Sequence, residues 1–254
     1  MRNNFLISGI CLLALAPLTA TADKVARAET TKQVAPEGLG LDTIVERHVA
    51  ALGGDKLLRA TKTMSFTVSG EKQGKAYTKT VTYARPNLMR VDIQMADGTM
   101  SKGFDGKVGW TKKASEAAVQ MSAEETVNLA SHAEFDEPLF DFAKRGTKVR
   151  LINKTEVDSK PAYDLEVTFA NGEMEHHFLD ASSYLLVKRT ATGKDKDGKA
   201  KQVTMAFGDY KKIQGRMVNL SLTYTADDGQ LHTNTVSKVS YDKPAPAKLF
   251  SMPK

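Results

Sequence analysis

The chain has 254 residues, of which 41% are hydrophobic and 26% are charged. This composition is typical of globular proteins and excludes a collagen, a coiled coil and a wholly disordered chain. The 36 Lys and Arg residues outnumber the 30 Asp and Glu residues, but the surplus is spread along the chain. The charge therefore favours solubility or weak attraction to anionic surfaces over a nucleic-acid site.

Residues 1–22 predict a cleaved signal peptide. Arg2 gives a positive start, an apolar run extends from Phe5 to Leu18, and Ala20-Thr21-Ala22 fits the small-residue cleavage pattern. The run is shorter than the roughly 20 residues that a membrane span needs. We therefore expect the chain to be exported and cleaved before Asp23.

The only cysteine, Cys11, lies inside this apolar run. A lipidation site is not expected there, because the bulky Ile10 stands where a small residue is required. The mature chain then has no cysteine, which excludes disulfides, thiolate metal sites and a cysteine nucleophile. An exported chain without disulfides must be stabilised by its core.

Residues 23–40 are polar without a clear period and predict a flexible leader. Apolar residues then recur at helical spacing, and Gly53-Gly54 is expected to end this helix. Asp55 is in position to cap a short second helix through Leu57 and Leu58. The apolar stripe of the first helix consists of Leu41, Ile44, Val45, His48, Val49 and Leu52.

From Thr63 the hydrophobic period changes to two, which predicts strands. Met89, Val91 and Ile93, for example, alternate with polar residues, and turn pairs such as Asp105-Gly106 separate the runs. The sum is an antiparallel meander of about 11–12 strands. No linker divides residues 41–254, so one domain of the mainly β, α+β class is expected.

A segment between residues 114 and 144 lacks strand alternation. Ser122-Ala123-Glu124-Glu125 matches a helix capping box. Apolar residues follow up to Phe142, and we expect this segment to lie over one face of the sheet as a cover. The pattern alone leaves open whether the 10 Met and 10 Phe residues fill a core or line an apolar cavity.

No local motif for catalysis or metal binding is present. His176 and His177 are adjacent on a predicted strand, so their side chains point to opposite faces and no metal site is expected there. The chain has no Gly-x-Ser-x-Gly motif. A hydrolase with a dispersed site stays a weak alternative, and we expect a protein that is not an enzyme and has no cofactor.

Several sequence elements, taken in order, resemble the LolA/LolB-like superfamily of periplasmic lipoprotein carriers, and more narrowly outer-membrane lipoprotein-sorting proteins. They are the helix end Leu52-Gly53-Gly54, Arg85-Pro86-Asn87-Leu88, Phe104-Asp105-Gly106-Lys107-Val108-Gly109-Trp110, Asp180 with Tyr184-Leu185, and Leu249-Phe250-Ser251-Met252-Pro253.

This resemblance implies an unclosed β-barrel with a helical lid over an apolar cavity that shields acyl chains in the periplasm. It also implies that Arg85 is the lid latch, hydrogen-bonded to the lid backbone, and that Trp110 is the aromatic residue of the Asp-Gly hairpin. The expected function is a periplasmic carrier that transfers lipoprotein acyl chains or lipids toward the outer membrane. The alternative is a lipid- or lipoprotein-sensing module that contacts a membrane partner.

The expected partners are acyl chains or lipid and a donor or acceptor protein of the inner or outer membrane, and the chain is expected to be a monomer. The residues expected to contact lipid share an apolar side chain on a predicted inner strand face or in the lid. They are Phe66, Val68, Val81, Tyr83, Met89, Val91, Ile93, Trp110, Val127, Leu129, Phe135, Leu139 and Phe140.

Overall fold

The computed structural model describes residues 38–72, 74–194, 200–225 and 231–254. The predicted signal peptide and most of the predicted leader lie outside the described residues. None of the helices in the described ranges is long and apolar enough to cross a membrane.

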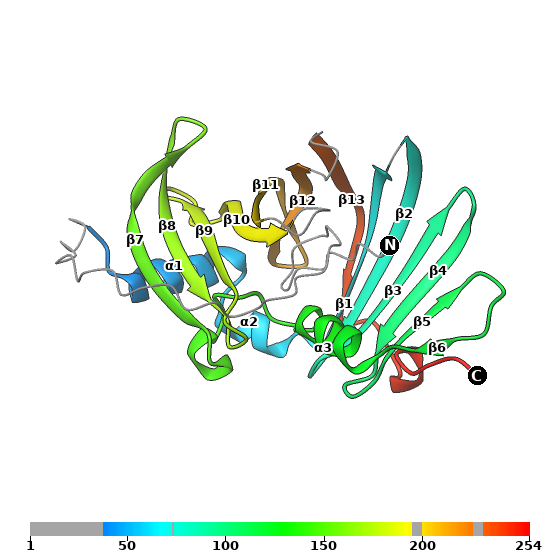
Figure 1. Ribbon diagram of the computed structural model, residues 1–254. Helices are drawn as coiled ribbons and strands as arrows, with labels where there is room; N and C mark the ends of the chain where they lie inside the picture. The colour runs from blue at the N-terminus through cyan, green and yellow to red at the C-terminus, as the bar shows by residue number, and fades with distance from the viewer. Residues whose placement is uncertain (1–37, 73, 195–199, 226–230) are drawn as a thin grey trace.

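The described strands form one antiparallel sheet of thirteen strands, curved into an open half-barrel (Figure 1). The sequence predicts eleven or twelve, and the two-residue β6 lies in a segment where no strand is expected. The strands are β1 (Thr63–Lys72), β2 (Lys75–Ala84), β3 (Leu88–Met95), β4 (Gly98–Phe104), β5 (Gly109–Lys113), β6 (Val119–Gln120), β7 (Lys148–Val157), β8 (Lys160–Thr168), β9 (Met174–Asp180), β10 (Leu186–Lys194), β11 (Ala200–Ile213), β12 (Arg216–Thr225) and β13 (Leu231–Tyr241).

The first and last strands pair in the middle of this sheet. Met64 on β1 lies opposite Tyr241 on β13, and the order across the sheet runs from β6 through β1 and β13 to β7. The two free edges, β6 and β7, are therefore consecutive along the chain. Residues 121–147, which we call the lid, connect one edge to the other.

Two helices precede the sheet, α1 (Leu41–Leu52) and α2 (Asp55–Ala60). Gly53 ends α1 with a φ of 135°, a value that side-chain-bearing residues rarely adopt. The prediction that Asp55 caps α2 is wrong. Gly54 is the N-cap residue, and Asp55 instead accepts a hydrogen bond from Arg59 one turn along the helix.

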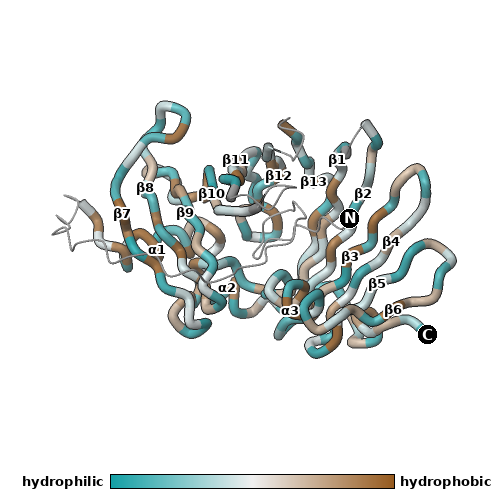
Figure 2. Tube along the Cα trace, viewed as in Figure 1, coloured by the Kyte–Doolittle hydropathy of each residue, from teal (hydrophilic) through white to brown (hydrophobic). Residues whose placement is uncertain are grey.

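The sheet face that the lid covers carries a large apolar cluster. Alternate residues of β1 to β4 supply one half of it, and β11 to β13 supply most of the other half. The period-two pattern causes this, because every second side chain of a strand points to the same face. The hydrophobic residues lie along the strands in Figure 2. A second cluster forms where Ile44 and Val45 of α1 pack against β7, β8 and β9.

Trp110 does not lie on this inner face, so its prediction as a lipid contact is wrong. It is opposite Gly103, which is opposite Arg90, and Arg90 alternates with the inner residues Met89 and Val91. Residues opposite one another across strands share a face, so Trp110 belongs to the outer face.

The outer-face site of Trp110 binds the end of the chain. The indole Nε1 donates a hydrogen bond to the carbonyl oxygen of Phe250 at 2.7 Å, and Arg90 donates to the carbonyl oxygen of Leu249 at 3.1 Å. A side chain at Gly103 would collide with the indole ring. Trp110 therefore fixes the C-terminal segment against β4 and β5 and does not line the interior.

The lid begins with helix α3 (Ala123–His132), which packs against β4 and β5. The predicted capping box is confirmed: Ser122 Oγ accepts from the backbone N–H of Glu125, and the Glu125 carboxylate accepts from the N–H of Ser122. The short helix η1 (Phe142–Arg145) then leads to β7.

We expect Ser122→Ala to lower the free energy of unfolding by about 1 kcal/mol, because the first turn of α3 loses its side-chain acceptor. Urea unfolding measures this loss. Ser182→Ala, in the turn after β9, is the matched control and should change stability by less than about 0.5 kcal/mol. Equal effects of the two substitutions would contradict a stabilising role for the cap.

Candidate functional site: the lid and the pocket beneath it

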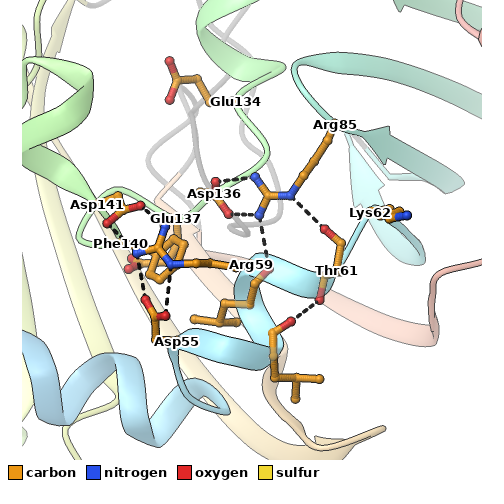
Figure 3. A network of polar contacts seen from close by, with 12 residues as sticks. Asp55, Arg59, Thr61, Lys62, Arg85, Glu134, Asp136, Glu137, Phe140 and Asp141 are labelled. Carbon is orange, nitrogen blue, oxygen red and sulfur yellow. Dashed lines mark hydrogen bonds and ion pairs between the residues drawn. The ribbon is translucent and has the colours of Figure 1, made fainter.

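The lid contains a short acidic stretch, residues 134–141, which we call the lid loop. It carries four carboxylates, and each lies against a different basic side chain. Figure 3 shows two of these contacts, Asp136 with Arg85 and Asp141 with Arg59. The four pairs are Glu134 with Arg145, Asp136 with Arg85, Glu137 with His48, and Asp141 with Arg59.

Arg85, directly after β2, contacts both the lid loop and the end of α2. Its two terminal nitrogens donate to the Asp136 carboxylate at 2.6 and 2.7 Å. It also donates to the carbonyl oxygens of Leu58 and Thr61 at 3.1 and 2.8 Å, and its guanidinium lies 4.4 Å from the ring centre of Phe135. A planar guanidinium can make all these bonds at once, so Arg85 joins the lid loop to the end of α2.

The expectation that Arg85 binds the lid backbone is wrong, because it reaches the lid through the Asp136 side chain. The lid backbone is bound by Arg145 of η1. Arg145 donates to the carbonyl oxygens of Asp136, Glu137, Pro138 and Phe140 at 2.6–3.1 Å, and to the Glu134 carboxylate at 2.8 Å. One guanidinium thereby holds the loop in a tight curve.

Arg59 of α2 binds the far end of the lid loop. It donates to both carboxylate oxygens of Asp141, one at 2.8 Å, and lies 4.9 Å from the ring centre of Phe140. These hydrogen bonds lower the pKa of Asp141 to about 2. Asp141 is therefore charged at any physiological pH.

His48 of α1 makes the most buried contact with the lid loop. Its Nε2 lies 3.4 Å from the Glu137 carboxylate, and its Nδ1 donates to the carbonyl oxygen of Tyr184 at 2.7 Å. Burial disfavours a charged imidazole, but the negative charge of the nearby Glu137 outweighs burial and raises the pKa of His48. Burial likewise opposes the Glu137 carboxylate, yet His48 lowers its pKa.

A mostly apolar pocket of about 60 Å³ lies between the lid loop, the two N-terminal helices and the inner face of the sheet. Its volume is well below the roughly 150 Å³ of a cavity that binds benzene, so this pocket alone does not hold an acyl chain. It is lined by His48, Leu52, Leu58, Thr61, Met64, Phe135, Asp136, Glu137, Pro138, Phe140, His177, Leu186, Arg189, Tyr210, Arg216, Met217, Asn219 and Tyr241.

A buried charged group forms one wall of this pocket. The Glu175 carboxylate on β9 accepts a hydrogen bond from His177 at 2.8 Å and lies 3.3 Å from the guanidinium of Arg189. Arg189 is on β10, directly opposite His177. Burial lowers the pKa of His177 and would raise that of Glu175, but Arg189 and His177 together lower the Glu175 pKa. The group is therefore a carboxylate paired with a guanidinium, beside a neutral imidazole.

Most of the predicted lipid contacts are brought together on the inner face, although lipid binding itself stays a prediction. Leu139 belongs to the cluster around α1, and Phe140 lines the pocket. The inner cluster contains Phe66, Val68, Val81, Tyr83, Met89, Val91, Ile93, Leu129 and Phe135.

Val127 is wrongly placed by the prediction, because 69% of its surface is exposed. Leu129 of the same helix is buried in the inner cluster. Two residues along an α-helix correspond to a rotation of about 200°, so Val127 points away from the sheet.

Apart from Arg85, the charged members of the site were not predicted from the sequence. The prediction treated residues 135–142 as apolar cover and counted His48 only as part of a helix stripe. The signal present was four acids within eight residues of an apolar segment, a density that needs cationic partners once the segment is buried. Within the described ranges, no three His, Cys, Asp or Glu side chains could share a metal ion.

Comparisons with known proteins address the fold. No protein-family model and no curated protein matches the chain. Among solved structures, the chain is similar to a LolA superfamily protein from Nitrosomonas europaea, with a TM-score of 0.57 at 14% identity over 84% of this chain and 98% of that one.

Two further structures give the same result. A DUF1329 family protein from Desulfovibrio piger aligns with a TM-score of 0.55 at 12% identity over 83% of this chain and 97% of that one. A putative outer membrane lipoprotein-sorting protein domain from Vibrio parahaemolyticus aligns with a TM-score of 0.54 at 10% identity over 82% of this chain and 94% of that one. The chain therefore has a LolA-like fold, an unclosed antiparallel barrel with a helical lid.

Proposed function

We propose that this protein is a non-enzymatic periplasmic carrier that binds acyl chains of lipids or lipoproteins on the inner face of the half-barrel, beneath the lid, and passes them toward the outer membrane. The observation that supports this most is a broad apolar sheet face covered by a loop that contacts the body through three charged pairs and through the buried side chains of Phe135, Leu139 and Phe140. One similar structure is named as a lipoprotein-sorting domain, which agrees with the proposal.

The energetics favour a lidded carrier. An acyl chain left in water costs about 0.8 kcal/mol for each exposed CH₂, so a soluble carrier must enclose it. The same face left open would expose a large apolar patch that invites aggregation. A lid that closes over the empty face solves both problems.

The lid loop must move for a ligand to enter, because the pocket beneath it encloses only about 60 Å³. Phe135 and Phe140 project from the loop into the buried region and are almost fully covered. Ionic and hydrogen-bonded contacts can be exchanged for contacts with water at modest net cost. The polar part of the lid's attachment can therefore be released without unfolding the sheet.

Uptake of a fluorescent acyl lipid tests this function. Purified protein should bind pyrene-labelled phosphatidylethanolamine, and native mass spectrometry of protein from a periplasmic extract should show co-purified lipid. Recovery only as the free protein, together with no uptake of the labelled lipid, would refute the carrier function. Stoichiometric capture of a membrane protein without lipid would favour a sensing module instead.

A pair of methionine variants locates the binding face. Met100 lies opposite Ile93 and packs against the inner cluster while remaining partly exposed, whereas Met174 on β9 is exposed. We expect Met100→Glu to reduce lipid affinity at least fivefold, because its charge loses water when lipid binds. Met174→Glu should leave affinity unchanged, and equal losses would argue against binding at the inner face.

A further inference from the structure

The pocket wall includes a buried carboxamide that lacks a protein partner. Asn219 on β12 is only 4% exposed, lies opposite Tyr210 on β11, and lines the pocket. Its Nδ2 has no hydrogen-bond partner among the described residues. Buried side-chain donors are nearly always satisfied, and an unsatisfied one is costly, so this amide calls for an acceptor that the described part of the chain does not supply.

The charged groups at the pocket wall each face an opposite charge, although His48 Nε2 and Glu137 Oε1, which belong to one such pair, also lack a hydrogen bond among the described residues. Arg189 is paired with Glu175, Arg216 with Asp242, and Asp136 with Arg85. The charges around the pocket are therefore balanced within the protein. A charged ligand group would enter without a counter-ion and would pay the full cost of desolvation, whereas a neutral acceptor would not.

We infer that Asn219 is the hydrogen-bond donor that recognises the acyl carbonyl of the ligand, the neutral ester or amide group that joins an acyl chain to the rest of a lipid or lipopeptide. This inference rests on the proposed carrier function and specifies its ligand class. Met64, Leu186 and Met217 border the same pocket and suit the first methylenes beside the carbonyl. The remainder of the chain would extend over the inner face once the lid loop has moved.

Displacement of the fluorescent probe N-phenyl-1-naphthylamine tests this assignment with four compounds of matched length: methyl laurate, N-methyl lauramide, laurate and an n-alkane. Wild-type protein should prefer the ester and the amide to the alkane, and should bind laurate more weakly than the ester. The ester and amide arms distinguish the two kinds of acyl linkage.

Asn219→Leu should reduce the preference for ester over alkane about tenfold while leaving alkane affinity unchanged. It should also keep or raise the melting temperature, by about 2–4 °C, since it removes a buried unsatisfied donor. Asn219→Ser, which keeps a hydroxyl donor, should show an intermediate preference and provides a second test if the leucine variant folds poorly.

Asn234→Leu is the matched control. This asparagine is also fully buried, but its Oδ1 accepts from the Tyr77 hydroxyl at 2.7 Å. Its replacement should lower the melting temperature and leave the preference for ester over alkane unchanged.

Three results would overturn the inference while leaving the carrier function intact. The first is an unchanged preference for ester over alkane in Asn219→Leu, which would indicate that a structural water alone satisfies the amide. The second is an equal loss of affinity for ester and alkane in that variant. The third is tighter binding of laurate than of the ester by the wild-type protein. If wild-type protein binds none of the four compounds, the proposed function fails and this inference fails with it.

Discussion

Arg85→Leu is expected to lower the free energy of unfolding by about 2–3 kcal/mol and to loosen the lid loop while the sheet stays folded. The substitution leaves the Asp136 carboxylate, whose side chain is only 22% exposed, without its cationic partner. It also removes the donor to the carbonyl oxygens of Leu58 and Thr61. Hydrogen bonds to charged groups contribute about 1.5–3 kcal/mol, and we expect the total loss to stay within that range because the partly exposed Asp136 carboxylate regains bonds to water and leucine keeps part of the contact with Phe135.

Hydrogen exchange of the lid loop amides measures the local effect. If opening of the loop becomes about 2–3 kcal/mol easier, exchange should accelerate roughly 30- to 150-fold there, while the amides of β1 and β13 should stay the most protected. Uptake of the pyrene-labelled lipid should become faster. Unchanged exchange, uptake and release in this variant would remove the latch assignment.

Arg150→Leu provides the matched control. Arg150 on β7 also donates two hydrogen bonds to one carboxylate, that of Glu166, but its side chain is 60% exposed and lies outside the lid. An exposed pair of this kind contributes at most about 1 kcal/mol. The control should therefore lose little stability and keep the exchange rates of the lid loop.

The strands could be predicted from the sequence because each depends on a local pattern. Met89, Val91 and Ile93 alternate with polar residues, and a strand whose faces differ in this way has one stable orientation. The capping box at Ser122 is equally local. The lid segment could be recognised because it interrupts the alternation and yet remains apolar.

The outer-face site of Trp110 could not be predicted in this way. A large apolar residue on a short strand such as β5 gives no reliable period, so its hydrophobicity alone suggested the interior. The segment that covers it, around Phe250, is distant in sequence and is placed by side-chain hydrogen bonds from Arg90 and Trp110 to its backbone carbonyl oxygens. A large apolar side chain can occupy the outer face at this point because the C-terminal segment covers it.

The ionic contacts of the lid were also beyond local patterns. Arg85 and Asp136 are 51 residues apart, and either could be an exposed charge as far as its neighbours in sequence show. The burial of His48 followed from its place in the stripe of α1, but its partner Glu137 did not. Pairing of this kind is determined by the topology that brings α1, α2 and the lid loop together.

The contact between His48 and Glu137 should make the lid sensitive to pH. Because the pKa of His48 is raised above 6.5 in the folded protein, its contribution to stability is complete below pH 6.5 and is lost as the pH rises through the higher folded value. The pKa of Glu137 is lowered below 4.5, so its contribution is lost only as the pH falls below that range. The contact is therefore strongest between about pH 4.5 and 6.5 and weakens above it.

His177 contributes with the opposite sign. Burial lowers the pKa of this imidazole, so the folded state binds its proton less tightly than the unfolded chain does, and its contribution grows as the pH rises toward 6.5. The pH dependence of wild-type stability alone would therefore combine the contributions of His48 and His177. The difference in unfolding free energy between wild type and His48→Gln largely isolates His48, because His177 is present in both.

We expect this difference to be about 1–3 kcal/mol at pH 6, the cost of leaving a buried polar group such as the Glu137 carboxylate without its partner, and to shrink toward pH 8.5. Urea unfolding across that interval measures it, with hydrogen exchange of the lid loop as the local readout. His176→Gln is the control, because His176 is half-exposed and its partner is Asp164 on β8. The control substitution should lower the free energy of unfolding by less than about 1 kcal/mol and should not change the hydrogen-exchange rates of the lid loop.

A double-mutant cycle with Glu137→Gln separates the pair from its surroundings. Suppose that Glu137 causes the raised pKa of His48. The loss of unfolding free energy caused by His48→Gln in the Glu137→Gln background should then be the same at pH 6 and pH 8.5, because a buried imidazole without that carboxylate stays neutral throughout. A fall that persists in this background would assign the titration to another group. A difference that is constant with pH in both backgrounds would mean that the contact holds the lid by packing alone.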